Sequence, residues 1–394
     1  MRVLFLLLAL FLHISFGRDL SYDEFISKAY ENSQELVMQE AMTKSIQAEG
    51  RALSAWDSPY AEVSPSIVRN KDKRKFEVEA QVLLMITPKM PWVTSIIEDS
   101  YNIKNVKNLK MTELQKNIIA IGAKRAYLEY LVYKEQLEIY KNKEQLSLNL
   151  YEIAKKRFEA NRIAKVEFLR FKSDYSNALN ELKTQNLLVE SALKKLQVLI
   201  NDDSFSRIVD LDFYFMPSID LESSVSNSIY NEILSLEAED YEKSAKLVGR
   251  SIMDSFQIGA GYTFGQNSIN FKVIIPFPIT PKANHQQSAL MELQSASLRQ
   301  NEINKQKIRQ NATALYSQIK QQEEIIKLAE ESQKDSFSLF EIMQKGFDAG
   351  SISVFEYLNT KNSYLTSQIQ TTQEKLNYLN LLSLFEENIG RSVK

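Results

Sequence analysis

Histidine and cysteine, the side chains that most often perform catalysis or bind metals, are almost absent from this sequence. The 394 residues include no cysteine and two histidines, His13 and His285. A Ser-His-Asp triad built on His285 would need a turn such as Gly-x-Ser-x-Gly to carry its nucleophile, and the sequence contains no such turn. The chain also lacks a phosphate-binding loop and the His-x-x-x-His spacing of a metal site. We therefore expect no enzyme activity, no catalytic residue, no bound metal and no cofactor.

Two acidic residues occupy matching places in two related segments. RFEANRIAKVEFLRFKSDY (157–175) and GFDAGSISVFEYLNTKNSY (346–364) align without gaps from end to end and share seven identities. Each segment places a glutamate, Glu167 or Glu356, shortly after an expected turn at 159–165 or 348–354. A solvated carboxylate on a helix surface would fit this pattern at both positions.

These segments belong to a longer internal repeat. The tetrapeptide ITPK occurs at 86–89 and again at 279–282, and each copy closes an apolar run and opens a stretch of helix formers. Two matched motifs in the same order indicate a tandem duplication. We predict a first repeat at 18–205, a linker at 206–221 and a second repeat at 222–394.

Each repeat predicts a helix, two strands, a long helix, a turn and a return helix. Ten glycines and eight prolines in the chain favour a few very long helices. The helices are expected at 21–56, 92–159 and 165–200, then at about 222–252, 283–347 and 353–389. The strands are expected at about 59–69, 76–87, 255–264 and 268–280. The predicted fold class is therefore mainly α with a small β part, built from long antiparallel, coiled-coil-like helices.

The N-terminus and the net charge bear on location. MRVLFLLLALFLHISFG (1–17) has one arginine, an apolar run and small residues near its end, the pattern of a cleaved signal peptide. The apolar run is shorter than the roughly 20 residues of a spanning helix. The net charge of -2 argues against a nucleic-acid partner. We predict an exported protein.

The strands alternate between apolar and polar or small residues. Ile269, Phe271, Val273, Ile275, Phe277 and Ile279 lie on one face of the last strand, and Asn270 and Lys272 lie on the other. Strands of about 10 residues with an apolar outer face and a polar inner face are typical of outer-membrane barrels. Because four strands cannot close a barrel, several chains would have to share one.

With these features, the chain resembles the outer membrane efflux protein family, the TolC-like channels, from about residue 20 to 390. The resemblance implies a homotrimer in which three chains close a 12-stranded β-barrel in outer-membrane lipid, with an α-helical tunnel in the periplasm. It also implies that the tip of the tunnel docks a periplasmic adaptor (membrane fusion) protein coupled to an inner-membrane pump. The segment VIIPFPITPKANHQQSALMELQSA is similar to the heavy-metal-exporting, CzcC-like branch.

The resemblance also implies roles for particular residues. The adaptor-contacting tip turns would include Asn161 and Arg162 in the first repeat and Gly350 and Ser351 in the second. The pore constriction would use Glu356, Asn359 and Glu167, although Asn359 departs from the acidic residue of the family. Asn161 replaces the usual glycine and is the best other residue in a left-handed conformation. Arg162 is expected to pair with a nearby acid and hold the tip shut.

Two other classes of protein remain open at this stage. A periplasmic coiled-coil scaffold would explain the helices and the export, and a trimeric surface structural protein would explain strands together with coiled coil. Neither explains the strand alternation and the duplication together. The residues do not distinguish between metal cations and drugs as the exported substrate.

Overall fold

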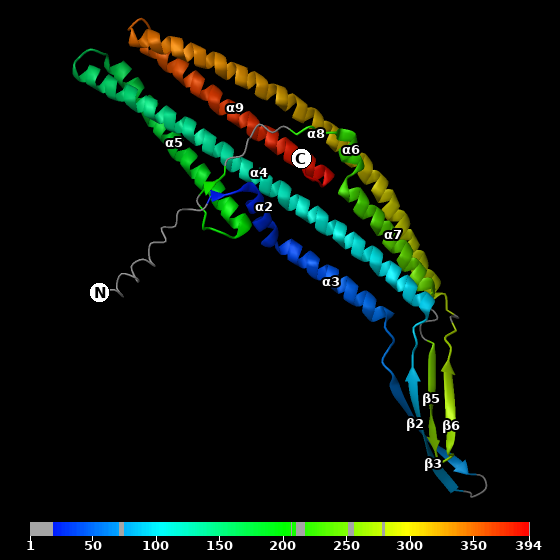
Figure 1. Cartoon of the computed structure of the whole chain (residues 1–394). Coiled ribbons are helices and arrows are strands. Elements are labelled where there is room, and N and C mark those ends of the chain that lie inside the picture. The colour runs from blue at the N-terminus through cyan, green and yellow to red at the C-terminus, as the bar shows by residue number, and fades with distance from the viewer. Residues whose placement is uncertain are drawn as a thin grey trace, which may run out of the picture. The chain divides into compact units, whose positions relative to one another are not determined.

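The computed structural model describes residues 19–70, 75–205, 207–209, 217–250, 256–277 and 280–393. The expected signal peptide, most of the charged run KDKRK, much of the expected linker and Ile279 lie outside the described residues. The described chain is mainly helical with a small sheet, which confirms the predicted fold class at this level (Figure 1).

The chain divides into two compact units, and each unit takes residues from both halves of the sequence. We call the first the hairpin unit (Met1–Gln34, Lys116–Ser226 and Ile308–Lys394) and the second the sheet unit (Glu35–Gln115 and Asn227–Lys307). Two long helices, α4 (Pro91–Glu159) and α8 (Lys282–Asp348), contribute residues to both units. Pro91 opens α4 at a position where a missing N–H costs nothing.

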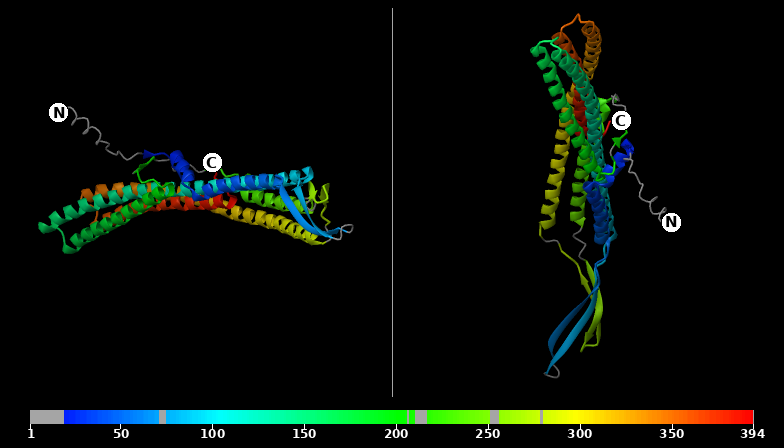
Figure 2. Two further views of the ribbon diagram at one scale, coloured as in Figure 1. Left: turned by 90° about the horizontal axis from the view of Figure 1, so that it is seen from below. Right: turned by 90° about the vertical axis from the view of Figure 1, so that its left-hand side faces the viewer.

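The hairpin unit contains two helical hairpins. In the first, the end of α4 turns into α5 (Lys165–Ile200), and in the second, the end of α8 turns into α9 (Val354–Ile389). The partners of each hairpin run side by side in Figure 1 and in both views of Figure 2. The N-terminal helix α2 (Tyr22–Glu31) packs Phe25 against Tyr127 of α4 and Leu196 of α5 in the main core of this unit.

A short parallel sheet also belongs to the hairpin unit. It pairs β1 (Asp19–Leu20) with β4 (Arg207–Ile208). The Tyr127 hydroxyl donates to the Val209 carbonyl at 2.6 Å, which ties this sheet to α4. No local sequence pattern predicts a pairing between two such short strands so far apart.

The sheet unit joins the two repeats edge to edge. Its four-stranded sheet has the order β2 (Tyr60–Asn70), β3 (Lys75–Ile86), β5 (Gln257–Phe264) and β6 (Ser268–Ile274), and every neighbouring pair is antiparallel. The central pairing of β3 with β5 sets Leu83 opposite Gly261 and Met85 opposite Gly259. Most of α3 (Gln34–Ser54) and all of α7 (Ile229–Arg250) complete this unit.

We predicted that a single helix opens each repeat, and both predictions are wrong. The first is divided into α2 and α3, because the Asn32 side chain donates to the Lys28 carbonyl at 3.0 Å and to the Ile200 carbonyl at 2.8 Å. An Asn side chain competes in this way with the helical hydrogen bonds of the backbone. The second is divided into α6 (Leu221–Ser226) and α7, with the break again at an Asn-Ser pair, Asn227 and Ser228.

The last strand is also shorter than expected. We predicted a strand over about 268–280, whereas β6 ends at Ile274. Pro276 and Pro278 follow, and a proline has no N–H to donate to a neighbouring strand. Within the described ranges, none of the helices contains an apolar stretch long enough to cross a membrane.

Candidate functional site

The turns between the paired helices have the same backbone geometry in both hairpins. Asn161 and Gly350 both adopt left-handed conformations, with φ of 57° and 75°. The next residue in each case donates its N–H five residues back: Arg162 to the Arg157 carbonyl at 2.8 Å, and Ser351 to the Gly346 carbonyl at 2.9 Å. This is the hydrogen-bond pattern of a Schellman helix end. Asn161 therefore replaces glycine without loss of the turn.

Stacked aromatic rings support each turn. Phe158 and Phe168 lie 4.9 Å apart with nearly parallel planes, and their repeat equivalents Phe347 and Tyr357 lie 4.4 Å apart in the same way. Burial, followed by the charge of Asp348, raises the pKa of Tyr357 to about 12, so its hydroxyl stays neutral. Each ring pair joins the two helices of a hairpin and holds its turn in place.

The two candidate pore glutamates have different local surroundings. Glu356 forms a capping box with Ser353, whose hydroxyl lies 2.8 Å and whose N–H lies 3.1 Å from the carboxylate. The Ser353 hydroxyl and backbone lower the pKa of Glu356. In the first repeat, Ala164 occupies the same position and makes no side-chain cap. Glu356 thus has a local structural role that half-buried Glu167 does not share.

The remaining residues predicted for the tip turns and the pore constriction are exposed. Arg162, Ser351 and Asn359 all present their side chains to solvent. The expected ion pair of Arg162 does not form among the described residues of the chain. Instead, a cation–π contact joins the hairpins near the tip, with Arg170 of α5 lying 5.1 Å from the ring of Phe355 of α9.

A buried ion pair, which the sequence analysis missed, lies within the hairpins, further from their ends than these turns. Lys361 of α9 is fully buried and pairs with Asp174 of α5. Its ammonium also donates to the Ser147 hydroxyl of α4 at 2.8 Å, and Asn362 donates to Asp174 at 3.1 Å. The sequence contains a signal that Lys361 is buried, because Lys361 lies three residues after Leu358 and four residues before Leu365, on the same apolar face of the helix.

Folding shifts the pKa values of both members of this ion pair. Burial raises the pKa of Asp174, but the charge and hydrogen bond of Lys361 outweigh this effect, so the pKa is lowered. Burial lowers the pKa of Lys361, and Asp174 only partly offsets it. The pair links three helices from both hairpins, so it specifies how α9 packs against α4 and α5.

The outer face of the four-stranded sheet is apolar and exposed. Phe271 of β6 is 80% exposed and Phe76 of β3 is 73% exposed, as the alternation predicts. Other large apolar side chains on exposed positions of the sheet are Val63, Ile67, Val78, Leu84, Ile269 and Val273. A contiguous apolar surface of this kind marks a site of contact with lipid or another protein.

The inner face of the sheet carries charges but is not uniformly polar. Lys272 of β6 donates to both carboxylate oxygens of Glu62 of β2, at 2.7 and 2.8 Å. The expectation of a polar inner face is wrong at Leu83 and Met85, which are both buried on it. Both lie opposite glycines of β5, and the Met85 sulfur fills the space beside Gly259, where a Cβ would lie 2.1 Å from it.

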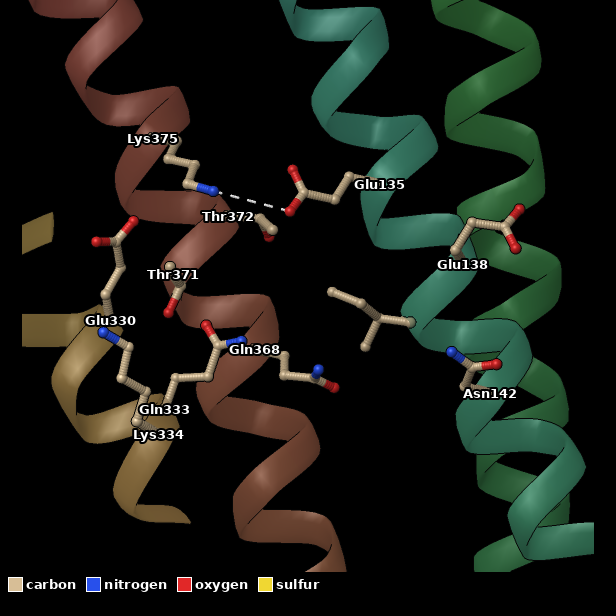
Figure 3. A pocket seen from close by; sticks show the side chains of 11 residues that line it. Glu135, Glu138, Asn142, Glu330, Gln333, Lys334, Gln368, Thr371, Thr372 and Lys375 are labelled. Atoms are coloured by element: carbon tan, nitrogen blue, oxygen red, sulfur yellow. Dashed lines mark ion pairs between the residues drawn. The ribbon is translucent and has the colours of Figure 1, made fainter. Parts of the chain in front are cut away.

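One further hollow lies in the hairpin unit. A pocket of 480 Å³ lies among α4, α8 and α9 (Figure 3). Glu135 faces Lys375 across it at 3.8 Å, and Glu138, Glu330 and Lys334 add further charges. Small-ligand pockets are lined mostly by apolar groups, so this one has the character of a hydrated groove. Among the residues that the structure describes, His, Asp and Glu side chains do not gather in any group suited to a metal ion.

Comparison with known proteins gives matches in structure only. No protein-family model matches the sequence, and no curated protein sequence matches it. Among solved structures, CusC, studied for its transmembrane channel formation, has a TM-score of 0.77 with 12% identity over 95% of this chain and 93% of that chain. The outer membrane protein VceC of Vibrio cholerae has a TM-score of 0.74 with 13% identity over 95% and 97%. The CmeC outer membrane channel of Campylobacter jejuni has a TM-score of 0.71 with 12% identity over 94% and 85%.

The chain has the fold of these channel proteins. The TolC-like fold implied by the sequence resemblance is therefore confirmed. The finer CzcC-like assignment stays a prediction, because identities of 12% and 13% show the fold alone.

Proposed function

We propose that the chain is a subunit of a homotrimeric outer membrane efflux channel, which conducts substrate passively from the periplasm to the outside. The observation that carries the proposal is the four-stranded sheet with an exposed apolar outer face and an ion-paired inner face, attached to long helical hairpins. The structural likeness to outer membrane channels over nearly the whole chain supports it. In this proposal the signal peptide directs export, and the two repeats each supply two strands and one hairpin.

The exposed edges of the sheet support the need for further copies. β2 and β6 each pair with one neighbour only, so one edge of each has no partner strand among the described residues. Unpaired backbone groups cannot face hydrocarbon, because no water is available to satisfy them. Three copies that join β6 of one to β2 of the next would close a 12-stranded barrel in outer-membrane lipid.

The hairpin turns are the proposed contact with the rest of an efflux system. Asn161, Arg162, Gly350 and Ser351 lie at or beside the turns, where a periplasmic adaptor coupled to an inner-membrane pump would dock. The ordered backbone of both turns supports a fixed binding surface. Substrates would be metal cations or drugs.

The pore constriction is assigned to Glu356, Asn359 and Glu167. All three lie within two helical turns of the hairpin ends, so a trimer could bring three copies of each toward one axis. Glu356 is held by Ser353 in a helix cap, whereas Glu167 has no such cap because Ala164 has no hydroxyl.

Purified protein in planar lipid bilayers tests the proposal. We expect detergent-extracted protein of trimeric mass to produce discrete conductance steps and to remain with outer membranes after a high-salt wash. A monomer that washes off and gives no conductance would identify a periplasmic scaffold instead. A trimer that stays in the membrane without conductance would identify a surface structural protein.

A further inference from the structure

A single ion pair crosses the whole inner face of the four-stranded sheet. Lys272 lies on β6 and Glu62 lies on β2, the two edge strands, and the ammonium donates to both carboxylate oxygens at 2.7 and 2.8 Å. The strands β3 and β5 lie between them. Ion pairs on a sheet ordinarily join neighbouring strands, where facing Cβ atoms are about 5 Å apart. This pair therefore depends on the shape of the whole sheet.

The spacing of a flat sheet would keep the two charges apart. Following the strand pairing from Lys272 across the sheet leads to Tyr60 of β2, two residues from Glu62. Three strand spacings of about 4.8 Å and two residues of about 3.4 Å would separate the two Cα atoms by about 16 Å. Side chains on strands stand nearly perpendicular to the sheet, so their charged ends would also stay well apart. The contact forms because the sheet curves toward its inner face.

A second contact also passes over a strand in the same region. The Tyr60 hydroxyl of β2 donates to the Gln257 side chain of β5 at 3.0 Å, across the intervening β3. On the same face, Leu83 and Met85 of β3 are only 1% and 0% exposed. Apolar side chains in the middle of a flat, open face would be exposed to solvent. Their burial fits an inner face that is folded inward.

Two glycines of β5 allow the sheet to curve between the edge strands. A Cβ on Gly261 would lie 1.9 Å from the Val82 carbonyl oxygen of β3. Together with the close approach of the Met85 sulfur to Gly259, this shows that β3 and β5 meet where only glycine fits. Glycines inside a strand mark places where a sheet bends. Because glycine also widens the freedom of the backbone, it permits a curve without fixing it. The ion pair between the edge strands supplies that constraint.

We propose that the ion pair of Lys272 and Glu62 is a clamp that holds the sheet of the single chain in the curvature of the closed barrel before other copies join. The proposal rests on the homotrimer proposed above and adds how one chain is prepared for assembly. A sheet that is already curved loses less conformational freedom when its edges meet those of other copies, so association is faster. A flattened sheet would instead offer two unpaired edges to wrong partners.

The rate of trimer formation after dilution from urea into detergent measures the clamp. Lys272→Met and Glu62→Gln each weaken it, and a partly exposed ion pair corresponds to roughly three- to fivefold slower assembly. Glu62→Lys together with Lys272→Glu restores the pair with exchanged charges and should recover the wild-type rate. The matched control is Glu79→Gln, which removes the same charge from the same face. The Glu79 carboxylate accepts a hydrogen bond from Gln266 of the adjoining turn, so this variant should assemble at the wild-type rate.

A covalent clamp separates the curvature from the charges. The chain has no cysteine of its own, so Glu62→Cys with Lys272→Cys can be linked within one chain by a flexible bis-maleimide in dilute protein, before detergent is added. Without the reagent, this double variant should assemble as slowly as the single variants. Once linked, it should assemble at the wild-type rate, because the link holds the two edge strands together as the ion pair does.

The outcomes separate the clamp from the proposed function. Single variants that assemble at the wild-type rate overturn the clamp and leave the channel intact. So does equal slowing by Glu79→Gln, which would indicate a general effect of charge on the inner face. Linked chains that stay slow, or that cannot enter trimers, also overturn the clamp alone. Wild-type protein that is monomeric by mass in detergent overturns the proposed function, and the clamp with it.

Discussion

Removing the charge of Asp174 should destabilise the hairpin unit more than any change to a surface ion pair. In Asp174→Asn, the fully buried Lys361 ammonium loses its only ion-pair partner among the described residues, although the Asn carbonyl and Ser147 still accept hydrogen bonds. Breaking a buried pair on one side costs about 3–5 kcal/mol. Because two hydrogen-bond acceptors remain, we expect the lower end, about 3 kcal/mol.

Thermal unfolding of the detergent-solubilised protein, followed by circular dichroism, measures this loss. For a unit of roughly 200 residues, 1 kcal/mol corresponds to about 2–4 °C, so the expected fall in melting temperature is about 6–12 °C. The matched control is Glu138→Gln, which breaks the exposed pair of Glu138 and Lys141 at 2.8 Å and should cost less than about 0.5 kcal/mol. The double variant Asp174→Leu with Lys361→Met should recover most of the stability, because an apolar pair needs no charge compensation.

The pH dependence provides an independent check. The pKa of Asp174 is lowered by folding, so its contribution is present above its unfolded pKa of about 3.9 and is lost as the pH falls through the folded pKa. In Asp174→Asn, the buried Lys361 loses its proton more readily than in the unfolded chain, so the variant should gain stability as the pH rises toward about 10. A variant that melts within about 2 °C of the wild type at neutral pH, with the same pH profile, would refute the reasoning.

Three further predictions concern the sheet, the turns and the pore. Phe271→Arg should cost about 2–4 kcal/mol in membrane insertion if the exposed face of the strand meets lipid. Asn270→Arg, on the inner face, should reduce insertion much less. Equal recovery of the two variants in outer-membrane fractions would place this strand outside lipid. Ser353→Ala should remove a helix cap worth about 1 kcal/mol and lower the melting temperature, and Ala164→Ser should add the corresponding cap and raise it. Unchanged melting temperatures in both variants would mean that the caps do not limit stability. Glu356→Lys should reverse cation selectivity in planar bilayers if a ring of this residue lines the pore, and an unchanged reversal potential would assign the constriction elsewhere.

Much of the local structure could be predicted because it depends on short-range physics. The long helices and the turns at Asn161 and Gly350 follow from the scarcity of helix breakers and from residues that tolerate a left-handed conformation. The apolar outer face of the sheet follows from the two-residue period of a strand. The helix breaks at Asn32 and at Asn227 were missed, because at Asn32 the side chain bonds to a carbonyl of a distant helix.

By itself, the sequence determined that the chain is built from two related repeats of helices, strands and turns, since composition and periodicity act over a few residues at a time. Only the tertiary structure decided that β3 pairs with β5, that Met85 fills the space beside Gly259, and that Lys361 is buried against Asp174. One of the seven identities between the repeats joins residues that differ in burial: Lys172 is exposed, whereas its equivalent Lys361 is buried. Two positions with the same residue differ in burial when different surfaces cover them, and those surfaces come from segments far away in the chain.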